Sequence, residues 1–341
     1  MEFVYFLIRR ALWSVVVLIG LSMTIFVIAR VLPGDPARMA LGPRASQQQV
    51  NQLKAKMGLN LPLVEQYERF AVGAAHGDLG LSLLSQRPVN DDIAATFAAT
   101  LELVLVTIVF AFAVGVPLGV LAAANKDSWI DNLVRLGTIF GAVTPSFLLA
   151  LMLQVLAGYV LHALPTTGRT SPDSAAVADI TGLLLVDTLM KGNFAGFVDA
   201  FKHILLPMIA LSAATTGQIA RITRASVIDV ARQDYIEAAR AFGIPSFVRV
   251  FKYTLRPAFV PPLTILGLEF ASLIGNAFVV ELVFSWPGMA SYGVRAILQK
   301  DLNAVMGVVM ISGLFFVIAN FLIDVAVGFV DPRVRISGQR A

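Results

Sequence analysis

The residues of this chain that could do chemistry are few, and most of them stand in apolar surroundings. Glu269 lies well inside a long apolar stretch. If that stretch spans a membrane, a charge at its centre costs roughly 2.5–3.5 kcal/mol. A carboxylate kept at that cost can bind a cation or an ammonium group, so we expect Glu269 to face a wet cavity or a subunit interface. A purely structural pairing is the alternative. Asn276, seven residues further on, falls on the same helical face.

Residues for covalent or metal chemistry are missing from the sequence. The chain has no cysteine, which excludes disulfides, thiolate metal sites and a cysteine nucleophile. Its three histidines are scattered, and no phosphate-binding glycine loop, nucleophile elbow, zinc-binding helix motif or pair of catalytic carboxylates occurs. We therefore expect a protein that is not an enzyme. Any work that it does with a nucleotide needs another subunit to bind that nucleotide.

A short polar segment, Asp234–Gly243, is typical of a docking helix. Asp234 is expected to cap the helix, with Glu237 completing a capping box. Gly243 suits the left-handed residue after the last turn, and Pro245 prevents continuation. The helix then presents one face with two small residues, which lets another surface come close. The residues expected to dock are Asp234, Tyr235, Glu237, Ala238, Ala239, Arg240, Phe242 and Gly243.

Composition indicates an all-α protein that crosses a membrane several times. Of 341 residues, 57% are hydrophobic and only 14% are charged, whereas soluble domains are nearer a quarter charged. The net charge of +4 is modest, and basic residues at one membrane face explain it without nucleic acid. Six apolar segments are long enough to span a hydrocarbon core of about 30 Å. They lie near Ala11–Val31, Leu101–Ala124, Val134–Leu161, Ile204–Ile222, Val260–Val283 and Ala304–Val330.

Several spans contain helix breakers. Thr144-Pro145 interrupts the third span, Pro117 lies in the second and Pro261-Pro262 opens the fifth. A kink whose freed carbonyl is satisfied by neighbours is the simpler interpretation of such a proline. The alternative is a hinge that lines the translocation pathway. On that interpretation Thr144, Pro145, Glu269 and Asn276 are all candidates for lining the pathway.

Lysine and arginine in the short loops predict the orientation. They gather before the first span, between the fourth and fifth spans, and after the sixth. By the positive-inside rule both termini and the Asp234–Gly243 helix are cytoplasmic. The opposite side then carries the longer loops, including a polar stretch of helical character at Ser46–Met57.

The docking segment resembles a known family motif. Glu237-Ala238-Ala239, then Gly243, then Leu255 are similar to the EAA motif of bacterial ABC-importer permeases, and Leu255-Arg256-Pro257 looks like the peptide-permease branch. Further similar landmarks are Leu32-Pro33-Gly34-Asp35-Pro36, His76-Gly77-Asp78-Leu79-Gly80, Thr181–Thr188, Phe284-Ser285-Trp286-Pro287-Gly288 and Asp331-Pro332-Arg333. The resemblance runs from Arg9 to Arg335 and points to the dipeptide/oligopeptide B-type permeases.

The resemblance implies an architecture and a set of partners. We expect six transmembrane helices in a type I importer permease fold. The first helix and a structured external loop occupy 1–93, the importer transmembrane domain with a coupling loop near 223–259 occupies 94–330, and a cytoplasmic tail occupies 331–341. The expected partners are a second homologous permease, two ATPase subunits that bind the ATP and magnesium, an external substrate-binding protein and the bilayer of the bacterial inner membrane. The resemblance implies import of di- or oligopeptides. The family also includes carriers of nickel, glutathione and oligosaccharides, which are the alternative substrates.

The outer end of the fifth span is a candidate external gate. Glu281 and Trp286 bracket it, and Pro287-Gly288 forms a turn. A tryptophan here most simply anchors at the membrane interface. A gate that contacts the substrate-binding protein is the alternative, and it would use all four of these residues.

Two rival functions come from other classes. A secondary transporter driven by an ion gradient would show inverted halves and discontinuous helices, and Glu269 alone is thin support for it. A membrane-embedded enzyme would need a catalytic set that the sequence lacks. Transport that responds to ATP but not to a proton uncoupler separates the first rival from an importer.

Overall fold

The computed structural model describes residues 2–31, 36–42, 44–56, 58–172 and 180–330. Four of its helices are each long and apolar enough to cross a membrane, and two bent helix pairs raise that number to as many as six. Two of the sequence landmarks fall mainly outside the described residues, at 32–35 and at 331–333, as does the tail at 331–341. The described part of the chain contains helices and one isolated β-bridge, Leu81 with Pro88, which confirms the all-α prediction.

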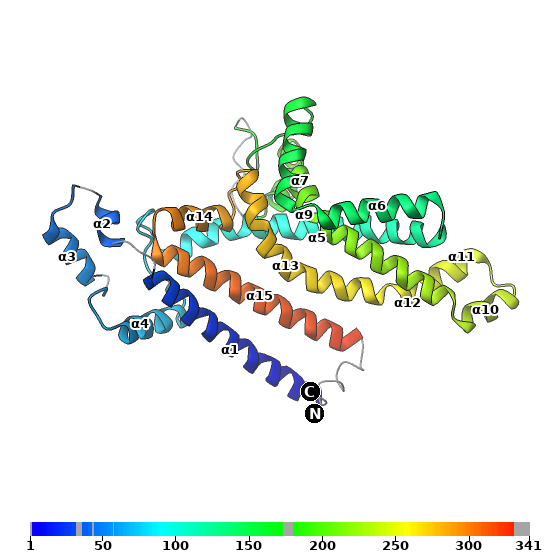
Figure 1. Cartoon of the computed structure of the whole chain (residues 1–341), viewed down its shortest axis with the longest axis horizontal. Coiled ribbons are helices and arrows are strands. Elements are labelled where there is room, and N and C mark those ends of the chain that lie inside the picture. The colour runs from blue at the N-terminus through cyan, green and yellow to red at the C-terminus, as the bar shows by residue number, and fades with distance from the viewer. Residues whose placement is uncertain (1, 32–35, 43, 57, 173–179, 331–341) are drawn as a thin grey trace. The chain divides into compact units, whose positions relative to one another are not determined.

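The helices follow one another along the chain as labelled in Figure 1. Their bounds are α1 Glu2–Val31, α2 Pro36–Leu41, α3 Gln47–Lys56, α4 Leu63–Ala75, α5 Val89–Ala124, α6 Trp129–Val143, α7 Ser146–Leu153, η1 Gln154–Val160, α8 Leu184–Met190, α9 Phe194–Ala231, α10 Asp234–Ala241, α11 Ser246–Val248, η2 Arg249–Leu255, α12 Arg256–Ala258, α13 Val260–Val283, α14 Met289–Leu298 and α15 Leu302–Val330. Here η marks a π-helix.

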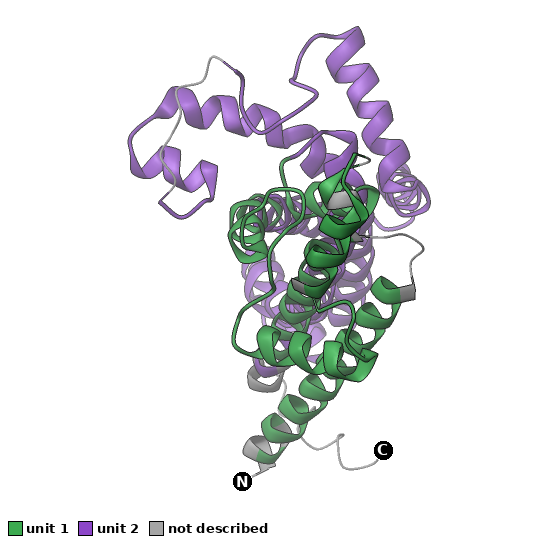
Figure 2. Ribbon diagram, turned by 90° about the vertical axis from the view of Figure 1, so that its left-hand side faces the viewer, with its two compact units in different colours: residues 1–100, 287–321 green, residues 101–286, 322–341 purple. Residues whose placement is uncertain are grey.

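Two compact units make up the chain, residues 1–100 with 287–321 and residues 101–286 with 322–341 (Figure 2). In the first unit, α4 packs on the C-terminal half of α1. The Phe26 ring meets the edge of the Tyr67 ring at a centroid distance of 5.4 Å, and the Tyr67 hydroxyl lies 2.9 Å from that of Ser22. The start of α5 packs on α15, where the Phe97 and Phe315 rings are 5.1 Å apart.

Helix α9 is the centre of the second unit, and glycines let its neighbours approach its backbone. A β-carbon at Gly119 of α5 would lie 2.5 Å from the Ala220 carbonyl oxygen, and one at Gly115 would lie 2.9 Å from that of Thr216. From the other side, a β-carbon at Gly141 of α6 would lie 2.8 Å from the Ala213 carbonyl oxygen. Small residues at such crossings are how membrane helices gain close van der Waals packing.

The third predicted span is not one continuous helix. Helix α6 and the α7–η1 pair meet at 107°, with the break at Thr144 and Pro145. Thr144 has a ψ of 121°, because the proline ring that follows disfavours the helical region for the residue before it. The breaker was predicted correctly, but its effect is a sharp turn of the chain rather than a kink within Val134–Leu161.

Candidate functional site

The predicted docking helix is present as α10 and starts one residue earlier than expected. Gln233 holds the N-cap position with extended backbone, and its side chain makes no capping hydrogen bond. Asp234 is the first helical residue, so the prediction that it caps the helix is wrong, and no capping box forms. Asp234 and Glu237 instead place two carboxylates in the first turn, where their negative charges interact favourably with the positive end of the helix dipole and stabilise the helix.

The end of α10 confirms the predicted role of Gly243. Its φ is +71°, in the left-handed region. The Gly243 N–H donates to the Arg240 carbonyl at 3.0 Å, and the Ile244 N–H donates to the Ala239 carbonyl at 3.1 Å. This pair of bonds is a Schellman motif, which satisfies carbonyls that the last turn would otherwise leave open. Pro245 follows and caps α11.

Helix α10 has a buried and an exposed side. Ile236 and Ala239 are buried, at 5% and 6% exposure. Ala239 was expected on the docking face, and it packs inward instead. Tyr235 and Phe242 are 46% and 86% exposed, and Ala238 between them is also exposed. An aromatic side chain as open as Phe242 has no packing role within the described residues, so this face is free to meet another surface.

The segment between α9 and α13, residues 232–259, holds α10 by specific contacts; we call it the connector. The Tyr235 hydroxyl donates to the Tyr253 carbonyl at 3.3 Å, and the Arg249 guanidinium donates to the Ile244 carbonyl at 3.1 Å. The Phe247 and Phe251 rings contact each other in a tilted arrangement at 4.5 Å between centroids, while both side chains stay exposed. The connector is thus braced by contacts among its own residues.

Glu269 lies where α13 packs on α9. The Thr215 hydroxyl donates to the Glu269 carboxylate at 3.1 Å, and Glu269 keeps partial exposure. Asn276 is exposed one heptad further along α13. The structure therefore gives Glu269 one neutral partner, and it does not bury the carboxylate in an ion pair among the described residues.

Thr144 and Pro145 form the break between α6 and α7. No hydrogen bond among the described residues joins their side chains to Glu269 or Asn276. That these four residues line one pathway therefore stays a prediction.

The candidate external gate is less open than predicted. Glu281 is fully buried and Trp286 is 1% exposed, so the prediction that Trp286 anchors at the membrane interface is wrong. The Arg169 guanidinium lies 5.7 Å from the Trp286 ring centroid, and this cation–π contact explains part of the burial. Gly288 holds the N-cap position of α14, and the adjacent Pro287 is exposed.

A buried ion pair between α6 and α9 was missed by sequence reasoning. The Arg224 guanidinium binds the Asp131 carboxylate through two nitrogens, at 2.7 and 2.6 Å. Asp131 is fully buried and also accepts from the Asp127 N–H at 3.0 Å. In the sequence Arg224 resembles the other basic residues at one membrane face. The only sequence signal for a partner is Asp131, an acidic residue near the start of the apolar helix α6.

Buried acids also hold the loop before α9. Glu102 of α5 accepts from Arg169 at 2.5 Å and from the Leu185 N–H at 2.7 Å. Asp187 accepts from the Thr181 hydroxyl and from the N–H groups of residues 180 to 182, at 2.6 to 3.1 Å. Burial raises the pKa of the Asp187 carboxyl, but these hydrogen bonds together outweigh burial and leave the pKa below its ordinary value.

A comparable network of hydrogen bonds orders the segment between α4 and α5 in the first unit. The buried Asp301 carboxylate accepts from the Ser82 hydroxyl at 2.6 Å and from the Leu84 N–H at 3.1 Å. Asp92 accepts from the Tyr292 hydroxyl at 3.2 Å. Burial, aided by the charges of Asp92 and Asp301, raises the pKa of Tyr292, so the phenol stays protonated as a donor.

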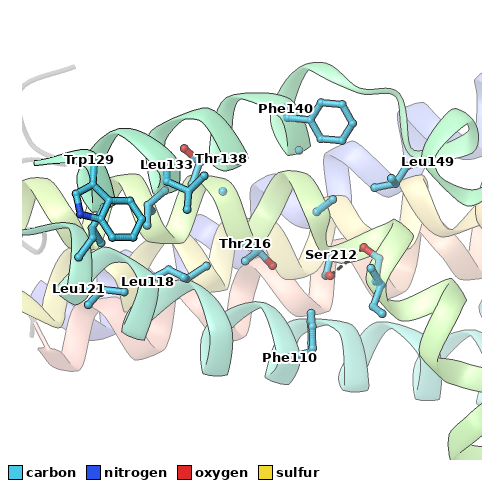
Figure 3. Close-up of a pocket in the computed structure, with 17 residues that line it drawn as sticks. Phe110, Leu118, Leu121, Trp129, Leu133, Thr138, Phe140, Leu149, Ser212 and Thr216 are labelled. Carbon is cyan, nitrogen blue, oxygen red and sulfur yellow. Dashed lines mark hydrogen bonds between the residues drawn. The ribbon is translucent and has the colours of Figure 1, made fainter. Parts of the chain in front are cut away.

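An apolar pocket of about 630 Å³ lies in the second unit among α5, α6, α7 and α9 (Figure 3). Phe110, Leu118 and Trp129 are among its lining residues, and its polar groups are hydroxyls such as that of Ser212. The Ser212 hydroxyl already donates to the Ile209 carbonyl at 3.1 Å. The lining holds no ionisable side chain and none of the predicted site residues, so the pocket suits apolar groups rather than a charged solute.

Comparison with known proteins identifies the family from nearly the whole length of the chain. Residues 115–336 match the family described as binding-protein-dependent transport system inner membrane component. Residues 3–104 match the N-terminal family of the same transport-system membrane components. The first match covers the connector and Glu269, and the second covers α1 and the segment between α1 and α5.

Curated relatives agree with these matches. The chain is 36% identical over 333 residues to the probable D,D-dipeptide transport system permease protein DdpB of Escherichia coli K12, covering 97% of this chain and 98% of the relative. It is 36% identical over 327 residues to the dipeptide transport system permease protein DppB of Alkalihalophilus pseudofirmus, with 96% and 98% covered. It is 33% identical over 330 residues to the glutathione transport system permease protein GsiC of Escherichia coli K12, with 97% and 98% covered. The chain belongs to the binding-protein-dependent transport system inner membrane component family, as a permease.

Proposed function

We propose that this chain is one of two permease subunits of an ATP-driven importer for dipeptides or short oligopeptides. The observation that carries the proposal is α10. This helix is braced inside the connector between two apolar helices, and it leaves Tyr235, Ala238 and Phe242 exposed. The names of the dipeptide permeases to which the chain is 36% identical support the substrate class.

The mechanism uses α10 as the point where an ATPase pushes. ATP and magnesium bind to two cytoplasmic ATPase subunits, and closure of these subunits displaces α10. The Schellman turn and the Tyr235–Tyr253 bond make α10 move together with η2 and α12. Motion then reaches α9 and α13, which carry Thr215 and Glu269, and the bundle changes between inward-facing and outward-facing states.

Glu269 is the group of this chain that we assign to the substrate pathway. It keeps partial exposure and has a neutral partner, so its carboxylate can accept an N–H from the ammonium group of a peptide. We expect Glu269→Gln to lower transport of peptides with a free amino terminus more than transport of N-acetylated ones. Equal transport of both by the variant and the wild type would remove Glu269 from the pathway.

The complete machine contains further components. A second, related permease closes the pathway, and an external substrate-binding protein delivers the peptide. The termini and the connector lie in the cytoplasm of a bacterial cell, and the longer loops lie outside. The division into 1–93, 94–330 and 331–341 follows the same proposal.

Cross-linking tests the proposed contact with unusually low background, because the chain contains no cysteine. Phe242→Cys, at the position with 86% exposure, should cross-link to the ATPase subunit in membranes. Val64→Cys, at 79% exposure in α4, is the matched control and should not. Cross-linking of the control but not of Phe242→Cys, or labelling of Phe242→Cys only from outside the cell, would refute the assignment.

The substrate needs a separate experiment because a glutathione permease is also similar, at 33% identity. The cognate binding protein should show a thermal shift with dipeptides or tripeptides. A shift with glutathione, nickel or an oligosaccharide and none with peptides would keep the importer and change its cargo. ATP-dependent uptake in vesicles that resists a proton uncoupler would exclude a gradient-driven transporter.

A further inference from the structure

A small polar pocket lies in the first unit where the apolar part of α1 ends. Its volume is about 180 Å³, and its lining comes from the end of α1, from α4, from the turn at residues 78–80 and from the start of α15. The polar side chains around it are those of Arg30, Gln66, Arg69, Asp78 and Asn303. The turn belongs to the His76–Gly80 landmark, to which the transport function gives no role.

Two buried atoms of this lining have no hydrogen-bond partner among the described residues. Gln66 is 8% exposed; its amide nitrogen donates to the Leu61 carbonyl at 2.7 Å, while its amide oxygen stays unpaired. The Nε of Arg30 is likewise buried and unpaired. Buried polar groups in folded proteins are normally satisfied. A ligand with one acceptor and one donor would satisfy both of these atoms.

The charges around the pocket favour a ligand that is both anionic and cationic. Arg30 and Arg69 supply two guanidinium groups, a kind of group that suits phosphate oxygens. Arg69 also donates to the partly exposed Glu65 carboxylate at 3.3 Å, which leaves its other N–H groups for a ligand. Asp78 supplies a carboxylate; one of its oxygens accepts from the Gly80 N–H at 2.9 Å, and the side chain stays exposed. The carboxylate and the free oxygen of Gln66 are acceptors for an ammonium group. Together these groups match a phosphate joined to a primary amine.

The position and size of the pocket point to a lipid headgroup. Val27 and Ile28, in the turn of α1 just before Arg30, are 56% and 51% exposed, as expected for side chains beside acyl chains. Leu63 and Val64 at the start of α4 are 61% and 79% exposed, which is typical of a helix that rests on a membrane surface. The volume is below the roughly 300–1,000 Å³ of pockets that enclose a drug-sized ligand. It has room for a headgroup, with the acyl chains left outside along α1.

The geometry points to a binding site for the headgroup of a phosphatidylethanolamine molecule at this end of α1. The phosphate binds Arg30 and Arg69, and the ammonium group binds Asp78 and the amide oxygen of Gln66. The lipid then joins α1, α4 and the 78–80 turn, so it stabilises the external loop on the membrane. This inference depends only on α1 crossing a bilayer and holds whatever the chain transports.

Native mass spectrometry of the full-length permease tests the site. The protein is released from nanodiscs that contain equal amounts of phosphatidylethanolamine, phosphatidylcholine and phosphatidylglycerol. All three lipids carry a phosphate, but only the first has an amine that donates N–H. We expect at least about tenfold preferential retention of phosphatidylethanolamine, as suits charge-assisted bonds at both ends of the headgroup. Equal retention of the three lipids would overturn the proposal.

Substitutions in the pocket distinguish a specific headgroup site from non-specific binding of lipid. Asp78→Asn removes the ammonium partner and should reduce the preference to near parity, and Arg30→Gln removes a phosphate partner and should lower the retention of all three lipids. Arg44→Gln, at an exposed arginine outside the pocket, should leave both unchanged. Asp78→Asn keeps the acceptor for the Gly80 N–H and is exposed, so it carries the test even if Arg30→Gln fails to fold. A preference that survives in Asp78→Asn would refute the assignment.

A final arm separates a lipid from a free zwitterion. Delipidated permease in detergent is incubated with glycylglycine or with inorganic phosphate. Neither should bind measurably at millimolar concentration or displace retained phosphatidylethanolamine. Displacement of the lipid by glycylglycine in the wild type, but not in Arg30→Gln, would show that the pocket binds a small solute and would overturn the lipid assignment.

Discussion

Replacing Gly243 with alanine should loosen the end of α10 without disturbing the rest of the molecule. Gly243 has a φ of +71°, and a β-carbon added there would meet no atom within 4 Å. The substitution therefore adds backbone strain and no steric clash within the chain. The same position changed to asparagine is a matched variant, because asparagine tolerates the left-handed region far better than alanine.

The size of the effect follows from that strain. A left-handed conformation costs an ordinary L-residue roughly 1–2 kcal/mol. Since about 1.4 kcal/mol is a factor of ten in an equilibrium constant, the closed turn of Gly243→Ala should lose roughly 5-fold to 30-fold in population relative to the open turn. Gly243→Asn should lose clearly less.

Hydrogen exchange of two amides measures whether the turn is closed, and stimulated ATP hydrolysis measures whether coupling needs the closed turn. The N–H groups of Gly243 and Ile244 close the turn by donating to Arg240 and Ala239. Hydrogen exchange over this segment of the full-length permease should be faster in Gly243→Ala than in Gly243→Asn, while peptides from α9 stay unchanged. In the reconstituted transporter, ATP hydrolysis stimulated by the binding protein should fall in the same order.

The reasoning fails if alanine and asparagine exchange equally fast, because the strain would then not be the cause. It also fails if the turn opens in Gly243→Ala while stimulated ATP hydrolysis keeps its wild-type rate. That second result would leave the turn as a local feature and remove α10 from the coupling pathway.

Three further predictions follow from buried contacts. Arg224→Met should cost about 3–5 kcal/mol, because it leaves the buried Asp131 carboxylate without its bidentate partner; thermal unfolding followed by size-exclusion chromatography should show this, and adding Asp131→Asn should recover part of the loss. Gly119→Val would place a β-carbon 2.5 Å from a carbonyl oxygen of α9 and should abolish folded protein, whereas Gly137→Ala, whose β-carbon meets nothing within 4 Å, should fold normally. The lowered pKa of Asp187 means that its stabilisation is present above the ordinary aspartate pKa of about 3.9 and is lost as the pH falls through the lower folded value. Thermal stability should therefore depend on Asp187 at pH 7, and the difference from Asp187→Asn should shrink only in strongly acidic solution.

The sequence predicted elements well where local chemistry decides. The extent of α15, the helix at α10 and the left-handed glycine after it all depend on residues close together in the chain. The apolar spans within α5 and α9 were also predicted, but both helices extend beyond the predicted Leu101–Ala124 and Ile204–Ile222. Thr144-Pro145 also predicted a break in the helix, because the steric effect of proline on the preceding residue is local.

The sequence failed where a residue's partner lies far along the chain. Arg224 looked like a charge at a membrane face, and its partner Asp131 is 93 positions away. Trp286 looked like an interface anchor, because nothing near it in the sequence shows that Arg169 covers its ring. The extent of the bend at Pro145 likewise depends on packing against α9, which no local rule supplies.

The capping error at α10 has a different origin. Asp234 and Gln233 are neighbours, and either can precede a helix. Asp234 inside the first turn still gains from the helix dipole, so its preference for the cap position is small. A difference of one residue at a helix end lies within the reach of such weak effects.

Helix α9 is continuous over 38 residues, about 57 Å, and two residues separate its end from the start of α10. A rod of that length that tilts by only about 5° around its middle moves each tip by roughly 2–3 Å, in opposite directions. A small rotation of α9 at its α10 end would thus shift its other end sideways by a similar distance, next to the loop that the Asp187 carboxylate holds by hydrogen bonds. That loop would have to deform or move together with α9, so the rigidity of the loop limits the amplitude of the motion.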